Sequence, residues 1–192
     1  MILAGGGSRR MGTDKLSLEV GRIPLLRRVH NALAVRCREV LVVGGAGAWQ
    51  QQGVRRIVGE RPGGQGPLAG LEAGLAAARN PLVFVAAGDM PFLTEALVGY
   101  LLGCLERGDA SAVVPCYRGR IHPLCAAYTR ELLPWVGSAL DGGVRSARVF
   151  LKGLDGVEHV GEELRRFGDP DHFLMNVNTP EDLRQARDEA AR

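Results

Sequence analysis

The apolar run from Leu82 to Ala87 constrains the fold of this chain more than any other stretch. It follows the breaker pair Asn80-Pro81 and leads into Gly88 and Asp89. An apolar run of strand length, without polar alternation, is typical of a strand buried on both faces of a helix-covered parallel sheet. Open sheets of this kind bind ligands at the carboxyl ends of their strands. The run therefore predicts an α/β fold and places Asp89 at its binding edge.

Strand and helix patterns alternate along the rest of the chain. The predicted strands are Met1–Ala4, Val40–Val43, Val54–Val58, Leu82–Ala87, Ala110–Pro115, Pro123–Tyr128 and an edge strand at Val157–Val160. The predicted helices are Pro24–Arg36, Pro67 to the stop at Asn80, one capped by Thr94, Arg130–Leu140 with an interruption near Pro134, Ser146–Lys152, and Thr179 to Arg192. The alternation predicts a mostly parallel sheet in a Rossmann-like three-layer sandwich. We expect residues 1–192 to form a single domain.

Composition narrows the class of protein. A chain of 192 residues with 46% hydrophobic composition is long enough to bury one sizeable core. Its 24 basic and 21 acidic residues give a net charge of only +3, which favours a small anionic ligand over nucleic acid. No apolar stretch reaches the roughly twenty residues of a membrane span, and no basic region precedes one at the N-terminus. We expect a cytoplasmic protein without membrane contact, whose four cysteines are packed rather than bridged.

The first fifteen residues, MILAGGGSRRMGTDK, have the composition of a phosphate-binding loop. A short apolar strand runs directly into Gly5, Gly6 and Gly7, and basic residues follow within the next eight positions. Glycines allow successive backbone N–H groups to turn inward, and Arg10 and Lys15 add positive charge around that concavity. Two common phosphate loops do not fit, because Arg10 stands at the third glycine of G-x-G-x-x-G and no G-K-[ST] follows the glycines.

A third pattern fits this stretch without gaps. The residues from Leu3 to Lys15 match L-A-G-G-x-S-x-R-M-G-x-D-K. This loop resembles the signature of the nucleotidyltransferases, and most closely that of the molybdenum cofactor guanylyltransferases. Four further segments resemble the same family in the same order, so the resemblance runs from residue 3 to residue 183: G-P-L-A-G at 66–70, A-G-D-M-P-F at 87–92, H-P-L at 122–124 and N-V-N-T-P at 176–180.

The resemblance implies a nucleotide-diphospho-sugar transferase type of fold and a defined reaction. Members of the family transfer GMP from GTP to molybdopterin, a pterin that carries a phosphate and a dithiolene, and release pyrophosphate. The terminal phosphate of the acceptor attacks the α-phosphorus in line, without a covalent enzyme intermediate. GTP and molybdopterin are then the expected substrates, and transient contact with molybdoenzymes or their chaperones is a further expectation.

The catalytic candidates are two cations and one carboxylate. Arg10 and Lys15 can stabilise the negative charge that develops as pyrophosphate leaves. Asp89 follows a buried strand and a glycine at the binding edge, and its carboxylate suits Mg²⁺, which takes one or two hard oxygen ligands from protein. The resemblance adds Asn178 as a second metal ligand. An alternative for Asp89 is an ordinary turn aspartate that caps Pro91 and Phe92.

The nucleotide site is assigned by the same resemblance. The residues implied are Leu3, Ala4, Gly5, Gly6, Gly7, Lys15, Glu60, Pro67, Leu68 and Asp89. A helix that begins with Pro67 and Leu68 offers free N–H groups at its first turn, near the base and ribose. The chain departs from the family at two positions, because Glu60 replaces the usual aspartate and Gly44 replaces an asparagine that often follows the second strand.

The acceptor candidates are His122, Asn176 and Asn178. Two asparagines alternating on one strand point to the same side and can present amides to a phosphate, a metal or a pterin. Alternatively, Asn178 ends a strand while Thr179 caps the next helix, and His122 is a packed histidine before proline.

Three other functions stay open at this stage. Sister cytidylyltransferases show L-A-A-G where this chain has L-A-G-G at residues 3–6, and the extra glycine favours the larger guanine. A sugar-phosphate nucleotidyltransferase and a nucleotide-binding regulator without turnover are the remaining alternatives. The first predicted strand begins at Met1, whereas family members enter it a few residues earlier, which leaves room for a start upstream.

Overall fold

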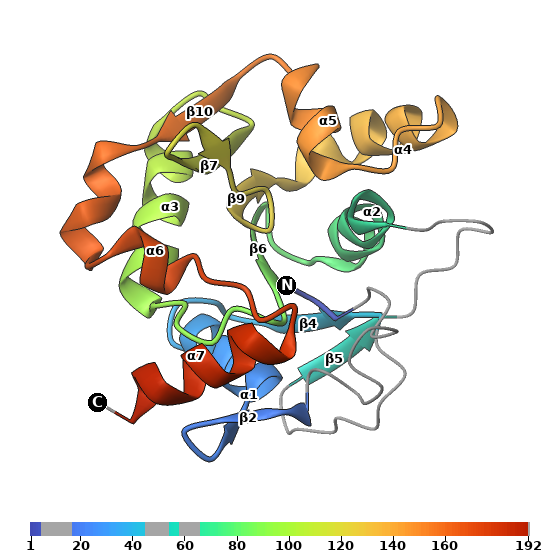
Figure 1. Ribbon diagram of the computed structural model, residues 1–192. Helices are drawn as coiled ribbons and strands as arrows, with labels where there is room; N and C mark the ends of the chain where they lie inside the picture. Colours follow the sequence, from blue (N-terminus) through green and yellow to red (C-terminus); the bar gives the residue numbers. More distant parts are fainter. Residues whose placement is uncertain (5–16, 45–53, 58–65, 192) are drawn as a thin grey trace.

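A central sheet organises the structure (Figure 1). The computed structural model describes residues 1–4, 17–44, 54–57 and 66–191. Within these residues the sheet has eight strands. Their order is β10 (Val157–Val160), β7 (Ala112–Tyr117), β9 (Cys125–Thr129), β6 (Leu82–Ala87), β1 (Ile2–Leu3), β4 (Val40–Val43) and β5 (Val54–Ile57), with β8 (Arg120–Ile121) paired to β7.

The sheet is mostly parallel, as the alternation of elements predicts. β1 lies between β4 and β6 and is parallel to both, and β4–β5 and β10–β7 are parallel pairs. β9 is antiparallel to both β6 and β7, so β6 and β7 point the same way. The start of β9 therefore lies at the edge where its neighbours end, and this brings residues from the second half of the chain to the predicted binding edge.

Helices cover both faces of the sheet and make three layers (Figure 1). One face packs against α1 (Leu25–Ala34) and α3 (Glu95–Arg107). The other packs against α2 (Pro67–Ala77), α4 (Leu133–Asp141) and α5 (Ala147–Lys152). The remaining helical segments are η3 (Arg130–Leu132), η4 (Glu162–Phe167), α6 (Pro170–Phe173) and α7 (Pro180–Ala190). The predicted three-layer α/β fold is confirmed.

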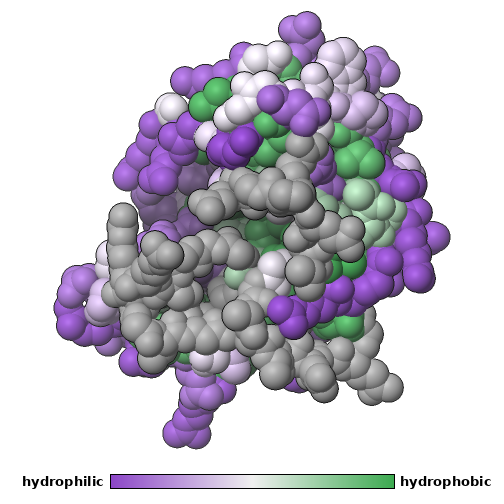
Figure 2. All heavy atoms as spheres, turned by 90° about the vertical axis from the view of Figure 1, so that its right-hand side faces the viewer, coloured by the Kyte–Doolittle hydropathy of each residue, from purple (hydrophilic) through white to green (hydrophobic). Residues whose placement is uncertain are grey.

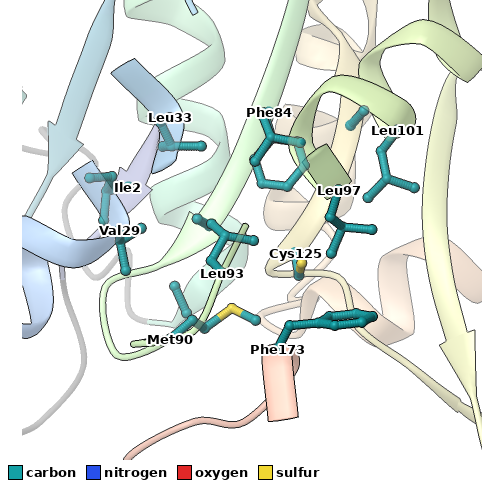
Figure 3. Packing of buried hydrophobic residues seen from close by; sticks show 14 of the residues in the cluster. Ile2, Val29, Leu33, Phe84, Met90, Leu93, Leu97, Leu101, Cys125 and Phe173 are labelled. Atoms are coloured by element: carbon teal, nitrogen blue, oxygen red, sulfur yellow. The ribbon is translucent and has the colours of Figure 1, made fainter. Parts of the chain in front are cut away.

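Strand β6 shows why its sequence is apolar throughout. Phe84 and Ala86 belong to the core on the α1–α3 side, and Val83 and Val85 belong to the core on the α2–α4 side. Figure 3 shows the first of these cores, in which Phe84 lies close to Leu97 and Leu101 of α3. A strand with a core on each face has no position for a polar side chain, which explains the unbroken run.

Two tight hairpins are absent from the sequence-based prediction. β2 (Glu19–Val20) pairs with β3 (Ile23–Pro24), so Pro24 ends a hairpin and α1 begins one residue later than predicted. Gly21 and Arg22 have φ values of 59° and 62°, the left-handed pair that a two-residue hairpin turn requires. The second hairpin joins β7 to β8 through Arg118 and Gly119, which also have positive φ. It carries β7 beyond the predicted end at Pro115.

The second half of the chain follows the prediction closely at its helices. Pro134 lies in the first turn of α4, where a missing N–H costs nothing, so the predicted interruption becomes a boundary between η3 and α4. Ser146 caps α5 through Val149 N, and Thr179 caps α7 through Asp182 N at 3.1 Å. Helix α7 ends at Ala190. The short helices η4 and α6 were not predicted.

Figure 2 presents a face on which the described residues around the rim are mostly hydrophilic. Hydrophobic described residues reach the surface toward the middle and the right-hand side. Among the helices that the structure describes, none combines the length and the apolar composition needed to cross a bilayer.

Candidate active site

The ends of β1 and β6 bring the first candidate residues together. Ala4 N donates to Val43 O at 2.8 Å, and Gly88 N donates to Leu3 O at 3.1 Å. These bonds continue the parallel ladders to the carboxyl edge of the sheet, so Leu3, Ala4 and Asp89 lie on neighbouring strand ends. The expectation that Asp89 stands at this edge is met by its position two residues after β6.

A backbone bond attaches the asparagine segment to Asp89. Val177 N donates to Asp89 O at 2.9 Å, and the Val177 side chain is buried. The predicted strand through Asn176 and Asn178 is wrong, because residues 175–178 have no strand assignment. The reason is that this segment crosses the end of the sheet, where this one bond replaces a ladder. Asn176 and Asn178 still flank a buried residue and both reach the same pocket.

The donor set around Asp89 suits a hard divalent cation. Asp89 Oδ1 is inaccessible to solvent, and the Asp89 backbone is bonded to the residue before Asn178. Carboxylate and amide oxygens are the ligands that Mg²⁺ prefers, and one or two protein carboxylates suffice when phosphates supply the rest. Within the described residues there is no group of three or more His, Cys, Asp or Glu side chains that could hold a metal. The buried carboxylate of Asp89 beside the asparagine segment fits a hard cation such as Mg²⁺ that takes its other ligands from phosphate and water.

A pocket of about 610 Å³ opens beside Asp89. It starts at Met90, the residue after Asp89, and extends between the β7–β8 hairpin, α5 and the start of α7. It contains all three predicted acceptor residues, His122, Asn176 and Asn178. The other lining residues are Tyr117, Arg118, Arg120, Ile121, Pro123, Leu124, Cys125, Arg148, Pro170, Asp171, Leu174, Met175 and Asp182. The volume is that of a small-molecule site.

The turn before β9 holds His122 in the pocket wall. His122 N donates to Pro115 O at 2.9 Å, and Cys125 N donates to His122 O at 3.0 Å. The buried Tyr128 hydroxyl donates to Pro123 O at 2.8 Å, and burial raises the pKa of this phenol. Three hydrogen bonds thus fix the His122-Pro123 turn, which explains why the histidine is both packed and pocket-lining.

The imidazole of His122 is electrically neutral at physiological pH. Burial, and to a smaller extent the positive charges of Arg120 and Arg148, lower its pKa to about 4. A neutral ring can donate or accept one hydrogen bond to a ligand without adding charge. His122 is therefore suited to recognition of a polar group rather than to acid catalysis near pH 7.

This depressed pKa predicts a pH dependence of stability. Because the folded pKa is about 4 and the ordinary value is 6.5, the unfolded chain binds a proton at His122 that the folded chain excludes. The stabilisation is fully present above pH 6.5 and is lost as the pH falls toward 4. Urea unfolding between pH 7 and 4 should show a smaller loss of unfolding free energy for His122→Gln than for the wild type. Parallel curves for the two proteins would contradict this.

The start of α2 is pinned to the loop before α5. Gly66 has φ +96°, and a Cβ at this position would lie 2.9 Å from Arg145 O, so both conformation and space require glycine. Leu68 N donates to the same Arg145 O at 3.3 Å, and the Leu68 side chain is buried. The N–H of Leu68 is therefore bonded to protein and is not one of the free N–H groups expected at this first turn. Leu3 packs against α2 near Gly70, which keeps Pro67 close to the end of β1.

Several predicted residues lie outside the described part of the chain. These are Gly5, Gly6, Gly7, Arg10, Lys15 and Glu60. Their roles in binding nucleotide and in catalysis stay predictions.

The sequence-based prediction missed three arginines of the pocket. Arg118 lies in the turn of the β7–β8 hairpin, Arg120 follows that turn, and Arg148 lies on α5. The Arg-Gly-Arg spacing at 118–120 is the one local signal, because a left-handed glycine between two arginines indicates a tight turn with both cations at its tip. Nothing in the sequence connects this turn to Arg148.

The sheet order and the pocket at the carboxyl ends of the strands define the class as a Rossmann-like α/β protein with a ligand site at this edge. The solved structure of 2-C-methyl-D-erythritol 4-phosphate cytidylyltransferase from Thermus thermophilus has the same fold, with a TM-score of 0.73 and 23% identity over 100% of this chain and 98% of that one. More specifically, the chain belongs to the MobA-like NTP transferase family, whose domain model matches residues 1–157.

Two relatives narrow the family further. A protein of Pelotomaculum thermopropionicum named "probable molybdenum cofactor guanylyltransferase" is 37% identical over 97% of this chain and 90% of its own length. The structure of molybdopterin-guanine dinucleotide biosynthesis protein A from Archaeoglobus fulgidus matches with a TM-score of 0.85 and 25% identity, over 99% of this chain and 97% of that one. The family predicted from the motifs is confirmed.

Proposed function

We propose that this protein transfers GMP from GTP to molybdopterin, forming the guanine dinucleotide of the cofactor and pyrophosphate. The family and the names of its relatives support this assignment. The observation that carries it in this chain is the bond from Val177 N to Asp89 O, which joins the candidate catalytic edge to the 610 Å³ pocket. A transferase needs a nucleotide site and an acceptor site that meet at the reacting phosphate, and this bond lies where they would meet.

The reaction is an in-line displacement. A phosphate oxygen of the acceptor attacks the α-phosphorus of GTP, a new P–O bond forms, and the bond to the β-phosphate oxygen breaks with pyrophosphate as the leaving group. Asn176 and Asn178 hold the acceptor phosphate beside Asp89. Arg10 and Lys15 stabilise the charge on the leaving group. Positioning and charge neutralisation supply most of the rate in such displacements.

Asp89 and Asn178 are the residues that would hold Mg²⁺. Bound there, the cation would neutralise the triphosphate oxygens and so favour attack at the α-phosphorus. Leu3, Ala4, Gly5, Gly6, Gly7, Pro67 and Leu68 would enclose the guanine nucleotide, and Glu60, in the position nearest to the family's usual aspartate, would also contact it.

Calorimetric titration with GTP, CTP and ATP, each with and without Mg²⁺, tests the proposal. We expect clear preference for GTP and tighter binding with Mg²⁺, followed by GMP transfer when molybdopterin is added. Preference for CTP would assign the chain to the cytidylyltransferases instead. Absence of nucleotide binding, or tight GTP binding without turnover on molybdopterin, would contradict the proposed reaction.

A further inference from the structure

The wall of the pocket formed by the β7–β8 hairpin and α5 is strongly basic. Arg118 and Arg120 come from the hairpin, and Arg148 comes from the first turn of α5. None of them belongs to the segment that carries Asn176 and Asn178. The pocket therefore has an amide region beside Asp89 and a separate basic wall supplied by different elements.

Arg120 and Arg148 approach the same turn. Arg148 Nη2 donates to Ile121 O at 3.2 Å, which fixes its guanidinium against the residue before His122. Both arginines act electrostatically on the His122 ring, where they add to the effect of burial on its pKa. Two guanidinium groups and one neutral imidazole thus face a common volume.

The three arginines differ in how their charge is balanced. Arg118 Nη2 lies 3.0 Å from Asp171 Oδ2, so its charge is paired. Among the carboxylates that the structure describes, none forms an ion pair with Arg120 or Arg148. Two positive charges on one wall repel each other, and a bound anion would relieve that repulsion.

We propose that Arg120 and Arg148, together with His122, form an anion subsite for the end of the acceptor remote from its reacting phosphate. The inference rests on the proposed function, in which that phosphate occupies the amide region beside Asp89. The remaining anionic chemistry of the acceptor is its dithiolene, or the metal–oxo group that the dithiolene carries. Planar guanidinium forks bind such dianions through paired hydrogen bonds, and the neutral imidazole adds a third contact.

Direct anion binding tests the subsite without any turnover. Molybdate is titrated by calorimetry into the wild type and into Arg120→Gln/Arg148→Gln, with saturating GTP present and in its absence. We expect the double variant to bind molybdate at least about tenfold more weakly, because each charged hydrogen bond that is lost weakens binding several-fold. Arg118→Gln is the matched control, since it lies on the same hairpin with its charge already paired by Asp171, and it should stay within about twofold of wild type.

Equal molybdate affinity in the wild type and the double variant would overturn the proposal, as would an equally large loss in Arg118→Gln. All three arginines are exposed, so thermal unfolding should be unchanged by these substitutions. A matching Tm excludes misfolding as the cause of a loss.

Kinetics with the acceptor provides the second test. The double variant should raise the KM for molybdopterin at least about tenfold, with kcat within about threefold and the Kd for GTP unchanged. If the KM rises equally for the metal-free and the molybdenum-loaded acceptor, the subsite binds the dithiolene. If the KM rises only for the loaded acceptor, the subsite binds the metal–oxo group. Weaker GTP binding in place of a raised acceptor KM would overturn the proposal.

The two proposals fail in different ways. Molybdate binding that depends on these arginines, without any GMP transfer, would support the subsite and contradict the proposed reaction. GMP transfer with the same acceptor KM in the wild type and in the double variant would support the reaction and contradict the subsite.

Discussion

Asp89→Asn is expected to lower kcat for GMP transfer by about a thousandfold, the upper range for loss of one preorganised electrostatic contact at a reacting centre. The substitution keeps the size of the side chain and removes its negative charge. The backbone at position 89 continues to accept from Val177 N, so the asparagine segment should keep its place. The loss is therefore expected in turnover and in Mg²⁺ dependence, not in the fold.

The measurement is initial rate against Mg²⁺ concentration at saturating GTP. Asp171→Asn is the matched control, because Asp171 is another aspartate of the same pocket but is paired with Arg118. We expect the control to retain kcat within about threefold. An Asp89→Asn protein with more than a tenth of wild-type kcat and an unchanged Mg²⁺ response would remove Asp89 from the catalytic centre. A nucleotide-binding regulator would show no transfer in any of these proteins.

The layers of the fold could be predicted because they follow from local patterns. Strand β6 contains no polar residue. Phe84 belongs to the core on one face of the sheet and Val85 to the core on the other, so the strand is buried on both faces. Thr179 followed by Pro180 indicated the start of α7, and the capping hydrogen bond from Asp182 N confirms it. These signals act within a few residues of chain, where backbone sterics and capping dominate.

Features that depend on contacts between distant segments could not be predicted in this way. The antiparallel insertion of β9 between β6 and β7 brings His122 to the same edge as Asp89, and no local pattern reports strand order. The segment through Asn176 and Asn178 alternates like a strand, yet Val177 N bonds to Asp89 O beyond the end of β6 and the segment has no strand assignment. The proximity of Arg148 to the hairpin arginines likewise depends on how α5 packs.

The candidate site shows the same difference between local features and contacts made by distant segments. The sequence motifs named both groups of residues that the structure brings together. Leu3, Ala4 and Asp89 lie at one edge of the sheet. His122, Asn176 and Asn178 line one pocket. The motif predicted free N–H groups at the first turn of α2, but it could not show that the Leu68 N–H bonds to Arg145 O, because Arg145 lies far away in sequence. A motif gives residue identities, whereas hydrogen-bond partners are decided by tertiary packing.

The capping box of α7 links stability to the position of Asn178. Asp182 Oδ2 accepts from Asn178 N and from Thr179 N, both at 2.8 Å. Helix α7 in turn packs Leu183 and Ala186 against Val177 and the α1–β2 region. One carboxylate thus holds the backbone of a proposed ligand and the start of the helix that closes the pocket.

Asp182→Ala should therefore cost about 2–3 kcal/mol of unfolding free energy, because the two charged hydrogen bonds that its carboxylate accepts in the capping box are lost at a partly exposed site. It should also lower kcat about tenfold under conditions where the protein is fully folded, since Asn178 is no longer held beside Asp89. The measurements are urea unfolding and saturating rates at a temperature well below the Tm of both proteins.

Glu181→Ala is the control for this prediction because it changes the neighbouring acidic residue of the same first turn. Glu181 is paired only with Arg184 among its described contacts, at side-chain exposures of 69% for both, so its loss should change the unfolding free energy by less than about 0.5 kcal/mol. If both alanine variants were equally stable, the capping box would not be the anchor of α7. Asp182→Ala could also lose stability but keep the wild-type kcat. In that case the hydrogen bond from Asn178 N to Asp182 would not be needed to position the Asn178 side chain beside Asp89.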